Sequence, residues 1–220
     1  MLLHVLFVAH VVVLGYWLGS ELVINSTFRY VSYGASIPFA ERSRLLEHVM
    51  DADQHVRYAL VLQAGLGFTL AILYGYVPGG SSLAWAIAIA AVVWLAFVEV
   101  THRVRHGAAG KGLAAFDRGS RYVLMAVLLC IAFGLIGSTW NMPLWLRWKV
   151  GLFACAMASG VGIRLALIAY FRTWAVMARE SPNAETNAVI RRSYWQATSV
   201  LILLWVFVAA LVVVSMWKPT

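Results

Sequence analysis

The segment SLAWAIAIAAVVWLAFVEVTHRVRH, residues 82–106, decides the fold class of this chain. It is long and apolar enough to cross a bilayer as one helix, which takes about 20 residues. Glu99, His102 and His106 near its end are spaced three and four apart, so a helix brings them to one face. An acid and two imidazoles are costly in such a helix. They therefore either serve a function or are interfacial residues, with Glu99 paired to a neighbouring arginine.

The composition is that of an integral membrane protein. Of the 220 residues, 62% are hydrophobic and 12% are charged, whereas about a quarter of the residues of a soluble domain are charged. The formal net charge of +8 is also a feature of nucleic-acid-binding proteins, but here the basic residues lie at the ends of apolar segments and form no patch. We therefore expect membrane lipid around the chain and no nucleic acid.

Hydropathy predicts an all-α membrane protein, a six-transmembrane helix bundle. The expected spans are residues 2–30, 53–76, 82–106, 112–138, 144–178 and 186–217, and they leave no room for a separate soluble domain, so residues 1–220 form a single domain. The connection between the first two spans mixes apolar and charged residues. This mixture is typical of a short interfacial helix at about 39–50, or of an ordinary solvated helix.

The basic residues predict the orientation of the bundle. Most of the 17 lysines and arginines flank the connections that follow spans one, three and five, and only Arg147, Lys149 and Lys218 flank the other side. Under the positive-inside rule both termini then lie outside, which is periplasmic in a Gram-negative cell. We expect a multi-pass protein of the bacterial inner membrane.

Three histidines are predicted to meet at one depth in the membrane. The turn Pro78-Gly79-Gly80-Ser81 joins spans two and three in an antiparallel hairpin. Counted from this turn, His55 lies about 24 residues back, and His102 and His106 lie about 22 and 26 residues forward. At about 1.5 Å per residue they reach similar depths, so we expect them to lie close together.

Further polar residues in the spans complete the predicted site. His10 lies mid-membrane in span one, on the same helix face as Glu21. Arg164 in span five lies at a depth similar to those of Glu21 and Glu99, and a buried arginine there needs a carboxylate from a side chain or a cofactor. The residues expected to contact the acid groups of a cofactor, or to pair with those that do, are Arg57, Arg103, Arg121, Arg164, Glu21 and Glu99.

Several segments resemble the CopD-like family of integral membrane proteins. In the second half of the chain they are RGSR (118–121), PLWLRWKVGLF (143–153) and GVGIR (160–164). The first half, with a histidine-bearing first helix and DQHVR (53–57) entering the second, is similar to uncharacterised bacterial relatives of that family. The resemblance implies copper uptake or handling or, in the relatives, a haem-bearing membrane subunit beside a redox enzyme.

The residue pattern favours a haem b site. Haem b between helices needs axial ligands on facing helices, small residues beside the ring and basic residues for its propionates. His55 with His102 or His106 would supply the iron ligands, and His10 would serve a second haem or a quinone site. We therefore predict a b-type cytochrome subunit that transfers electrons between a partner dehydrogenase and the quinone pool, without catalytic turnover of its own.

Other functions would use the same residues. Copper transport would use histidine and methionine side chains near the outer surface, with His10 as a relay, since imidazoles and thioethers suit Cu(I). A di-metal site would be built on Glu99-x-x-His102 and completed by Glu21 or His55. The chain would otherwise be a membrane anchor for a partner enzyme, and the sequence leaves open whether it forms a homo-oligomer.

Overall fold

The computed structural model describes residues 1–105, 107 and 110–219. These residues form six helices and no strand: α1 Leu2–Tyr33, α2 Phe39–Leu73, α3 Gly80–Arg103, α4 Gly110–Ala132, α5 Leu144–Glu180 and α6 Ala184–Trp217. Within this described part, five helices, all except α4, are long and apolar enough to cross a membrane. The prediction of an all-helical, multi-pass membrane protein is thereby confirmed, while the sixth span and the sides of the termini stay predictions.

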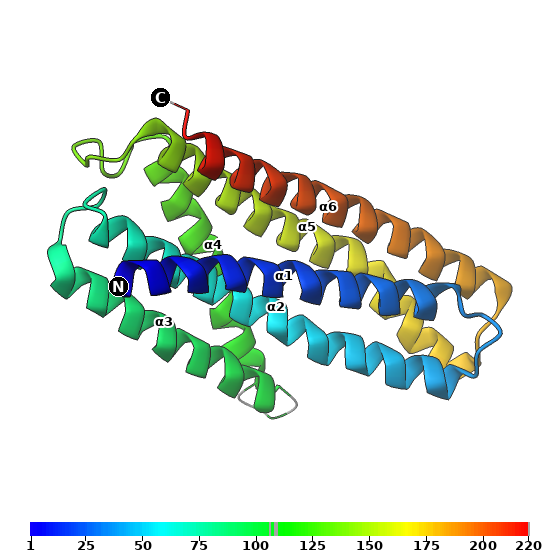
Figure 1. Ribbon diagram of the computed structural model, residues 1–220. Coiled ribbons are helices and arrows are strands. Elements are labelled where there is room, and N and C mark those ends of the chain that lie inside the picture. The colour runs from blue at the N-terminus through cyan, green and yellow to red at the C-terminus, as the bar shows by residue number, and fades with distance from the viewer. Residues whose placement is uncertain (106, 108–109, 220) are drawn as a thin grey trace.

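Four long helices extend beyond two short ones. At about 1.5 Å per residue, α1, α2, α5 and α6 are about 48–55 Å long, whereas α3 and α4 are about 35 Å long. In Figure 1 the two termini lie at one end of the molecule, together with the connections from α2 to α3 and from α4 to α5. The connection from α3 to α4 falls well short of the opposite end, where α1 joins α2 and α5 joins α6.

The protruding part, which we call the extension, is a four-helix bundle with an aromatic core. This core is formed by Phe28, Val31, Leu46, Val49, Tyr170, Trp174, Met177, Ile190 and Tyr194. Arg42 of α2 is fully buried beside it. Its Nε donates to the Val31 carbonyl oxygen at 3.1 Å, its Nη1 donates to Asn187 Oδ1 at 3.0 Å, and its guanidinium lies 5.1 Å from the ring centroid of Trp174. Arg42 thus links all four helices of the extension.

Residues 39–50 belong to α2 and do not form a separate interfacial helix. The sequence predicts a break before residue 53, but one helix runs from Phe39 to Leu73. No proline or glycine interrupts the chain between Pro38 and Gly65, so helix propagation meets no obstacle. Leu46 and Val49 on this first part are buried in the extension, and this packing replaces the contact with a membrane surface that the sequence suggested.

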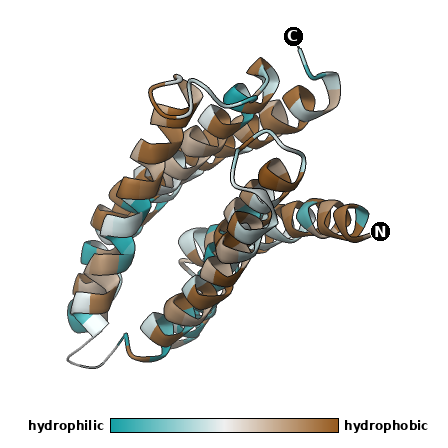
Figure 2. Ribbon diagram, turned by 90° about the vertical axis from the view of Figure 1, so that its left-hand side faces the viewer, coloured by the Kyte–Doolittle hydropathy of each residue, from teal (hydrophilic) through white to brown (hydrophobic). Residues whose placement is uncertain are grey.

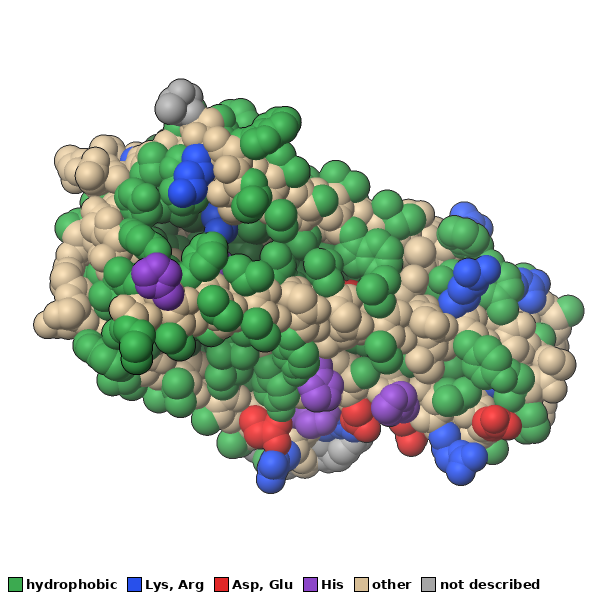
Figure 3. All heavy atoms as spheres, in the orientation of Figure 1, with side chains coloured by type: hydrophobic (Ala, Val, Ile, Leu, Met, Phe, Trp, Pro, Cys, Tyr) green, Lys and Arg blue, Asp and Glu red, His purple; other side chains and the backbone are tan. Residues whose placement is uncertain are grey.

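Outside the extension, where all six helices lie together, the exterior of the protein is apolar, as expected of a surface that faces lipid. Exposed hydrophobic side chains recur along the helices, among them Val5, Val8, Val12, Trp85, Ile89, Val92, Leu203, Val206 and Val213. On the face drawn in Figure 3, hydrophobic side chains cover most of this part, and charged side chains gather along the lower edge and over the extension.

The two short helices pack on different neighbours. α3 packs mainly on α2, and α4 packs mainly on α5, with few contacts between α3 and α4. Figure 2 shows these two helices standing apart above the connection that joins them. This separation leaves room for the apolar cavity described below.

Candidate functional site

A cavity of about 600 Å³ lies between α1, α2, α4, α5 and α6, next to the core of the extension. Most of its walls are apolar, but the charged side chains that line it are five arginines and two carboxylates: Arg57, Arg118, Arg121, Arg164, Arg172, Glu21 and Asp53. We call it the basic cavity. Its volume lies within the range of about 300–1,000 Å³ that is usual for small-molecule sites.

Two of these arginines are neutralised by acids on their own helices. Arg57 Nε and Nη2 donate to Asp53 Oδ2 at 3.1 and 3.0 Å. Arg121 forms an ion pair with Asp117, whose side chain is buried. Both pairs are four residues apart on one helix, a spacing that brings side chains together on the same face. The helices α2 and α4 therefore preorganise Arg57 and Arg121 at the cavity.

Three arginines of the cavity have no such partner. Within the described residues, Arg118, Arg164 and Arg172 form no hydrogen bond or ion pair. Arg57 and Arg121 are close enough to repel Arg164 electrostatically, and Asp53 attracts it. All three side chains are exposed, so each can contact an anion that enters the cavity. The cavity therefore has a strong electrostatic preference for an anion.

Glu21 is the acid that α1 contributes to the basic cavity. Its side chain is 7% exposed, and Trp17 Nε1 donates to Glu21 Oε1 at 3.3 Å. It faces the arginines of α2, α4 and α5 across the cavity without an ion pair to any described residue. Glu21 thus limits how much negative charge a ligand can bring to this side of the cavity.

A second cavity of about 710 Å³ lies between α2, α3 and α4, and we call it the apolar cavity. Four residues, Arg57, Leu60, Arg121 and Met157, line both cavities, so the two are contiguous. The remaining lining is mainly hydrophobic or small: Val61, Ala64, Gly65, Phe68, Ile87, Ala90, Ala91, Trp94, Val98, Phe116, Gly119, Val123, Leu124 and Val127, with Asp117 and Ser120. A Cβ on Gly65 would lie 2.5 Å from Ala91 Cβ, so this glycine permits the close approach of α2 and α3.

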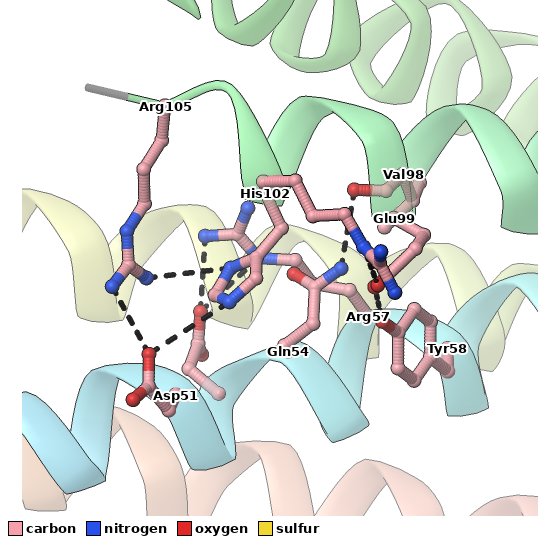
Figure 4. Close-up of polar contacts among 10 residues, drawn as sticks. Asp51, Gln54, Arg57, Tyr58, Val98, Glu99, His102 and Arg105 are labelled. Atoms are coloured by element: carbon pink, nitrogen blue, oxygen red, sulfur yellow. Dashed lines mark hydrogen bonds and ion pairs between the residues drawn. The ribbon is translucent and has the colours of Figure 1, made fainter. Parts of the chain in front are cut away.

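The predicted iron ligands His55 and His102 have different partners in the structure. His55 Nδ1 lies 2.5 Å from the hydroxyl oxygen of Tyr16 on α1. His102 Nε2 lies 3.7 Å from Asp51 Oδ1, and its Nδ1 lies 3.3 Å from Arg105 Nη1. Figure 4 shows Asp51 of α2 facing His102 of α3 and Arg105, which follows the end of α3. The similar depth of the two histidines along the hairpin therefore does not bring them onto a common ligand.

Glu99 and Arg103 also lie at the contact between α2 and α3, away from the basic cavity. Arg103 Nε donates to Glu99 Oε1 at 2.5 Å, and the Tyr58 hydroxyl donates to the other carboxylate oxygen. One turn away, Gln54 Nε2 donates to the Val98 carbonyl oxygen at 3.1 Å (Figure 4). These contacts hold the hairpin together, which is the scaffold role that the sequence left open for Glu99.

His10, another predicted metal ligand, lies apart from His55 and His102. His10 packs beside Gly67, where an added Cβ would lie 3.3 Å from His10 Cε1, and His10 Nδ1 is buried without a hydrogen bond to any described residue. His106 lies outside the described residues. Among the residues that are described, no histidine lines either cavity, and no three His, Cys, Asp or Glu side chains gather as a metal site would require.

The positions of the predicted ligands and of the predicted charged residues determine how well a haem fits the basic cavity. Four of the six residues expected near the acid groups of a cofactor, Arg57, Arg121, Arg164 and Glu21, do line the basic cavity. The imidazoles of His10, His55 and His102 lie outside it, so the described residues do not fit a haem with imidazole ligands there. The assignment of His55, His102, His106 and His10 as metal ligands stays a prediction.

Sequence reasoning missed Arg118 and Arg172 as cavity residues and missed the apolar cavity altogether. In the sequence, Arg118 and Arg172 indicate only topology, because both lie near the ends of apolar segments. Whether they line the cavity depends on the rotation of α4 and α5 about their axes, for which the sequence carries no direct signal.

Comparisons of the chain with family models, curated proteins and solved structures find no match. The resemblance to the CopD-like family therefore stays a prediction, and the function has to be argued from the cavities themselves.

Proposed function

We propose that this chain is a six-span membrane protein that binds an anionic amphiphile, with the acid group of the ligand held by the arginines of the basic cavity. One observation carries the proposal. Arg118, Arg164 and Arg172 line one cavity of the helix bundle, and none of them has a hydrogen bond or ion pair within the described chain.

The sixth span in this proposal is α4. Asp117, Arg118 and Arg121 make it too polar to count as a span by composition. Asp117, however, is buried, and Arg118 and Arg121 line the basic cavity. A helix with its charges toward the bundle interior can cross a bilayer. With six spans, the distribution of basic residues puts both termini outside and the extension on the cytoplasmic side of a bacterial inner membrane.

The balance of charges indicates the acidity of the ligand. Five arginines line the basic cavity, opposed by Glu21, Asp53 and, through its pair with Arg121, Asp117. With every group ionised, five positive and three negative charges leave an excess of two positive charges. Guanidinium groups bind phosphate and carboxylate oxygens in bidentate geometry, so they suit such an acid group better than a point cation would.

The cytochrome function predicted from the sequence is the second candidate. It is favoured by the same cavity, because Arg57, Arg121 and Arg164, predicted for the propionates, meet there with Glu21. A haem is itself an acidic amphiphile, and its iron would still need ligands that the described residues of the cavity do not offer. Transport of copper has no comparable feature in the described structure to support it.

The proposal is tested by titrating the purified protein, in a neutral detergent, with dihexanoyl phosphatidic acid and with dihexanoyl phosphatidylcholine in a calorimeter. We expect binding of the phosphatidic acid and none of the zwitterionic analogue. Arg118→Gln and Arg164→Gln should each weaken binding about tenfold or more, since a hydrogen bond to a charged group contributes about 1.5–3 kcal/mol.

Arg179→Gln is the matched control. Arg179 is exposed on α5, the helix that carries Arg164, and lines neither cavity. It loses the same charge and should bind like the unmodified protein. Equal affinity of all three variants, or equal binding of the two lipids, would refute the proposal.

A further inference from the structure

Together the two cavities have a charged part beside an apolar part, which matches the charged head and apolar tail of a lipid. The basic cavity carries the excess positive charge, and in the apolar cavity the polar side chains, Arg57, Arg121, Asp117 and Ser120, are few. Arg57 and Arg121 belong to both cavities and mark the junction between them. A ligand that occupies both must therefore combine an acid group with an apolar part that begins directly beside it.

We propose that the ligand is a lipid phosphomonoester, whose phosphate binds in the basic cavity and whose hydrocarbon chain lies in the apolar cavity. This inference rests on the proposed function and specifies its ligand class.

The charge excess selects a phosphomonoester. Near neutral pH a phosphate monoester carries about 1.5–2 negative charges, whereas a phosphodiester such as phosphatidylglycerol carries about one. The excess of two positive charges in the basic cavity matches the monoester. A zwitterionic head would bring a cation among five arginines, and a neutral quinone would leave their charge uncompensated.

The position of the apolar cavity suits a hydrocarbon chain that enters from the membrane. The cavity lies between α3 and α4, which make few contacts with each other. Phe116 and Val123 of α4 line it and are 60% and 64% exposed, so the cavity opens at the surface that faces lipid. A chain moving from lipid into this cavity stays in apolar surroundings, so the transfer is close to neutral in free energy. Selectivity then comes from the phosphate and its arginines.

Leu60 and Met157 form the apolar wall where the cavities meet. Leu60 of α2 is partly buried and packs against two core clusters, one that includes Trp17 and Val56 and one formed by Leu128, Ala154 and Met157. A larger side chain at this position would fill space where the two cavities adjoin while leaving every arginine in place. Leu60→Trp therefore tests binding of the hydrocarbon chain of the lipid separately from binding of its phosphate.

The test is native mass spectrometry of the protein mixed with equal amounts of dioleoyl phosphatidic acid, phosphatidylglycerol and phosphatidylcholine, with glycerol 3-phosphate in a separate titration. We expect the phosphatidic acid complex to exceed the phosphatidylglycerol complex at least severalfold, and the phosphatidylcholine complex to be weakest. Glycerol 3-phosphate should bind at least tenfold more weakly than the lipid. Equal binding of glycerol 3-phosphate would identify a site for free phosphate compounds and overturn the inference.

Variants distinguish this inference from the proposed function. Leu60→Trp should lose tenfold or more affinity for phosphatidic acid while Val93→Trp, on the exposed face of α3 outside both cavities, should not. If Leu60→Trp does not fold, Ala64→Leu, further inside the apolar cavity, gives the same test. If the folded cavity variant keeps full affinity for phosphatidic acid and Arg164→Gln loses it, the proposed position of the hydrocarbon chain is wrong and the proposed function stands. Full affinity in Arg164→Gln and Arg118→Gln would refute both.

Discussion

Arg42 is the residue whose replacement tests the extension most directly. We expect Arg42→Met to destabilise the protein, because it keeps an unbranched apolar stem and removes every donor. The Val31 carbonyl lies in the last turn of α1, where carbonyl groups lack partners within the helix, and Arg42 Nε supplies its donor. Asn187 Oδ1 would lose the donor Arg42 Nη1. Arg42→Met therefore leaves two buried acceptors without donors.

The expected loss follows from these contacts. Each buried acceptor left unsatisfied costs about 1–3 kcal/mol. The stacked position of Arg42 over Trp174 contributes about 0.5–2 kcal/mol more. Removing a buried charge that has no carboxylate partner offsets part of this cost. We expect a net loss of about 3 kcal/mol in the free energy of unfolding, and a smaller loss in Arg42→Lys, which can reach only one acceptor.

The assay is equilibrium unfolding in mixed micelles with increasing sodium dodecyl sulfate, followed by tryptophan fluorescence and far-ultraviolet circular dichroism. The control Arg44→Met changes an exposed arginine on the same helix and should shift the free energy by less than about 0.5 kcal/mol. A loss below about 1 kcal/mol in Arg42→Met, no larger than in Arg44→Met, would refute the assignment of Arg42 to the core of the extension.

The remaining predictions concern charge, cofactor and topology. Asp117→Asn removes the acid that pairs with Arg121 and should strengthen binding of dihexanoyl phosphatidic acid several-fold; calorimetry showing weaker binding by a folded variant would contradict the charge balance. If the chain is a b-type cytochrome, the purified protein should show a Soret band that sharpens and shifts on reduction, and metal analysis should find iron; copper without iron would favour copper transport instead. With both termini outside, a C-terminal reporter that works only in the cytoplasm should be silent, and a fully active one would reverse the orientation.

The positions of the helices along the chain were predictable because they depend on local properties. A bilayer sets the length of an apolar run, and glycine and proline mark the connections, as at Gly34, Pro78 and Pro143. The six predicted segments coincide with the six helices to within a few residues at most ends. The exception is α2, where the charged segment 39–50 continues the helix because it finds buried contacts with α1, α5 and α6.

Depth along a helix was predictable for the same reason, since each residue advances by about 1.5 Å whatever surrounds it. Counting residues grouped Glu21 and Arg164, which do line one cavity, with Glu99, which does not. The same count grouped His55 with His102, yet the structure pairs His55 with Tyr16 and His102 with Asp51 and Arg105.

Only the tertiary structure decided which side chains at one depth meet. The direction in which a side chain points depends on the rotation of its helix and on the neighbour that the helix packs against, and both follow from contacts between residues far apart in the sequence. Arg118 of α4 and Arg172 of α5 line the same cavity because of how α4 and α5 pack, and the apolar cavity exists because α3 packs on α2 and α4 packs on α5. The sequence alone determined a set of apolar helices with polar residues at known depths, and packing between distant segments determined the cavity that these residues share.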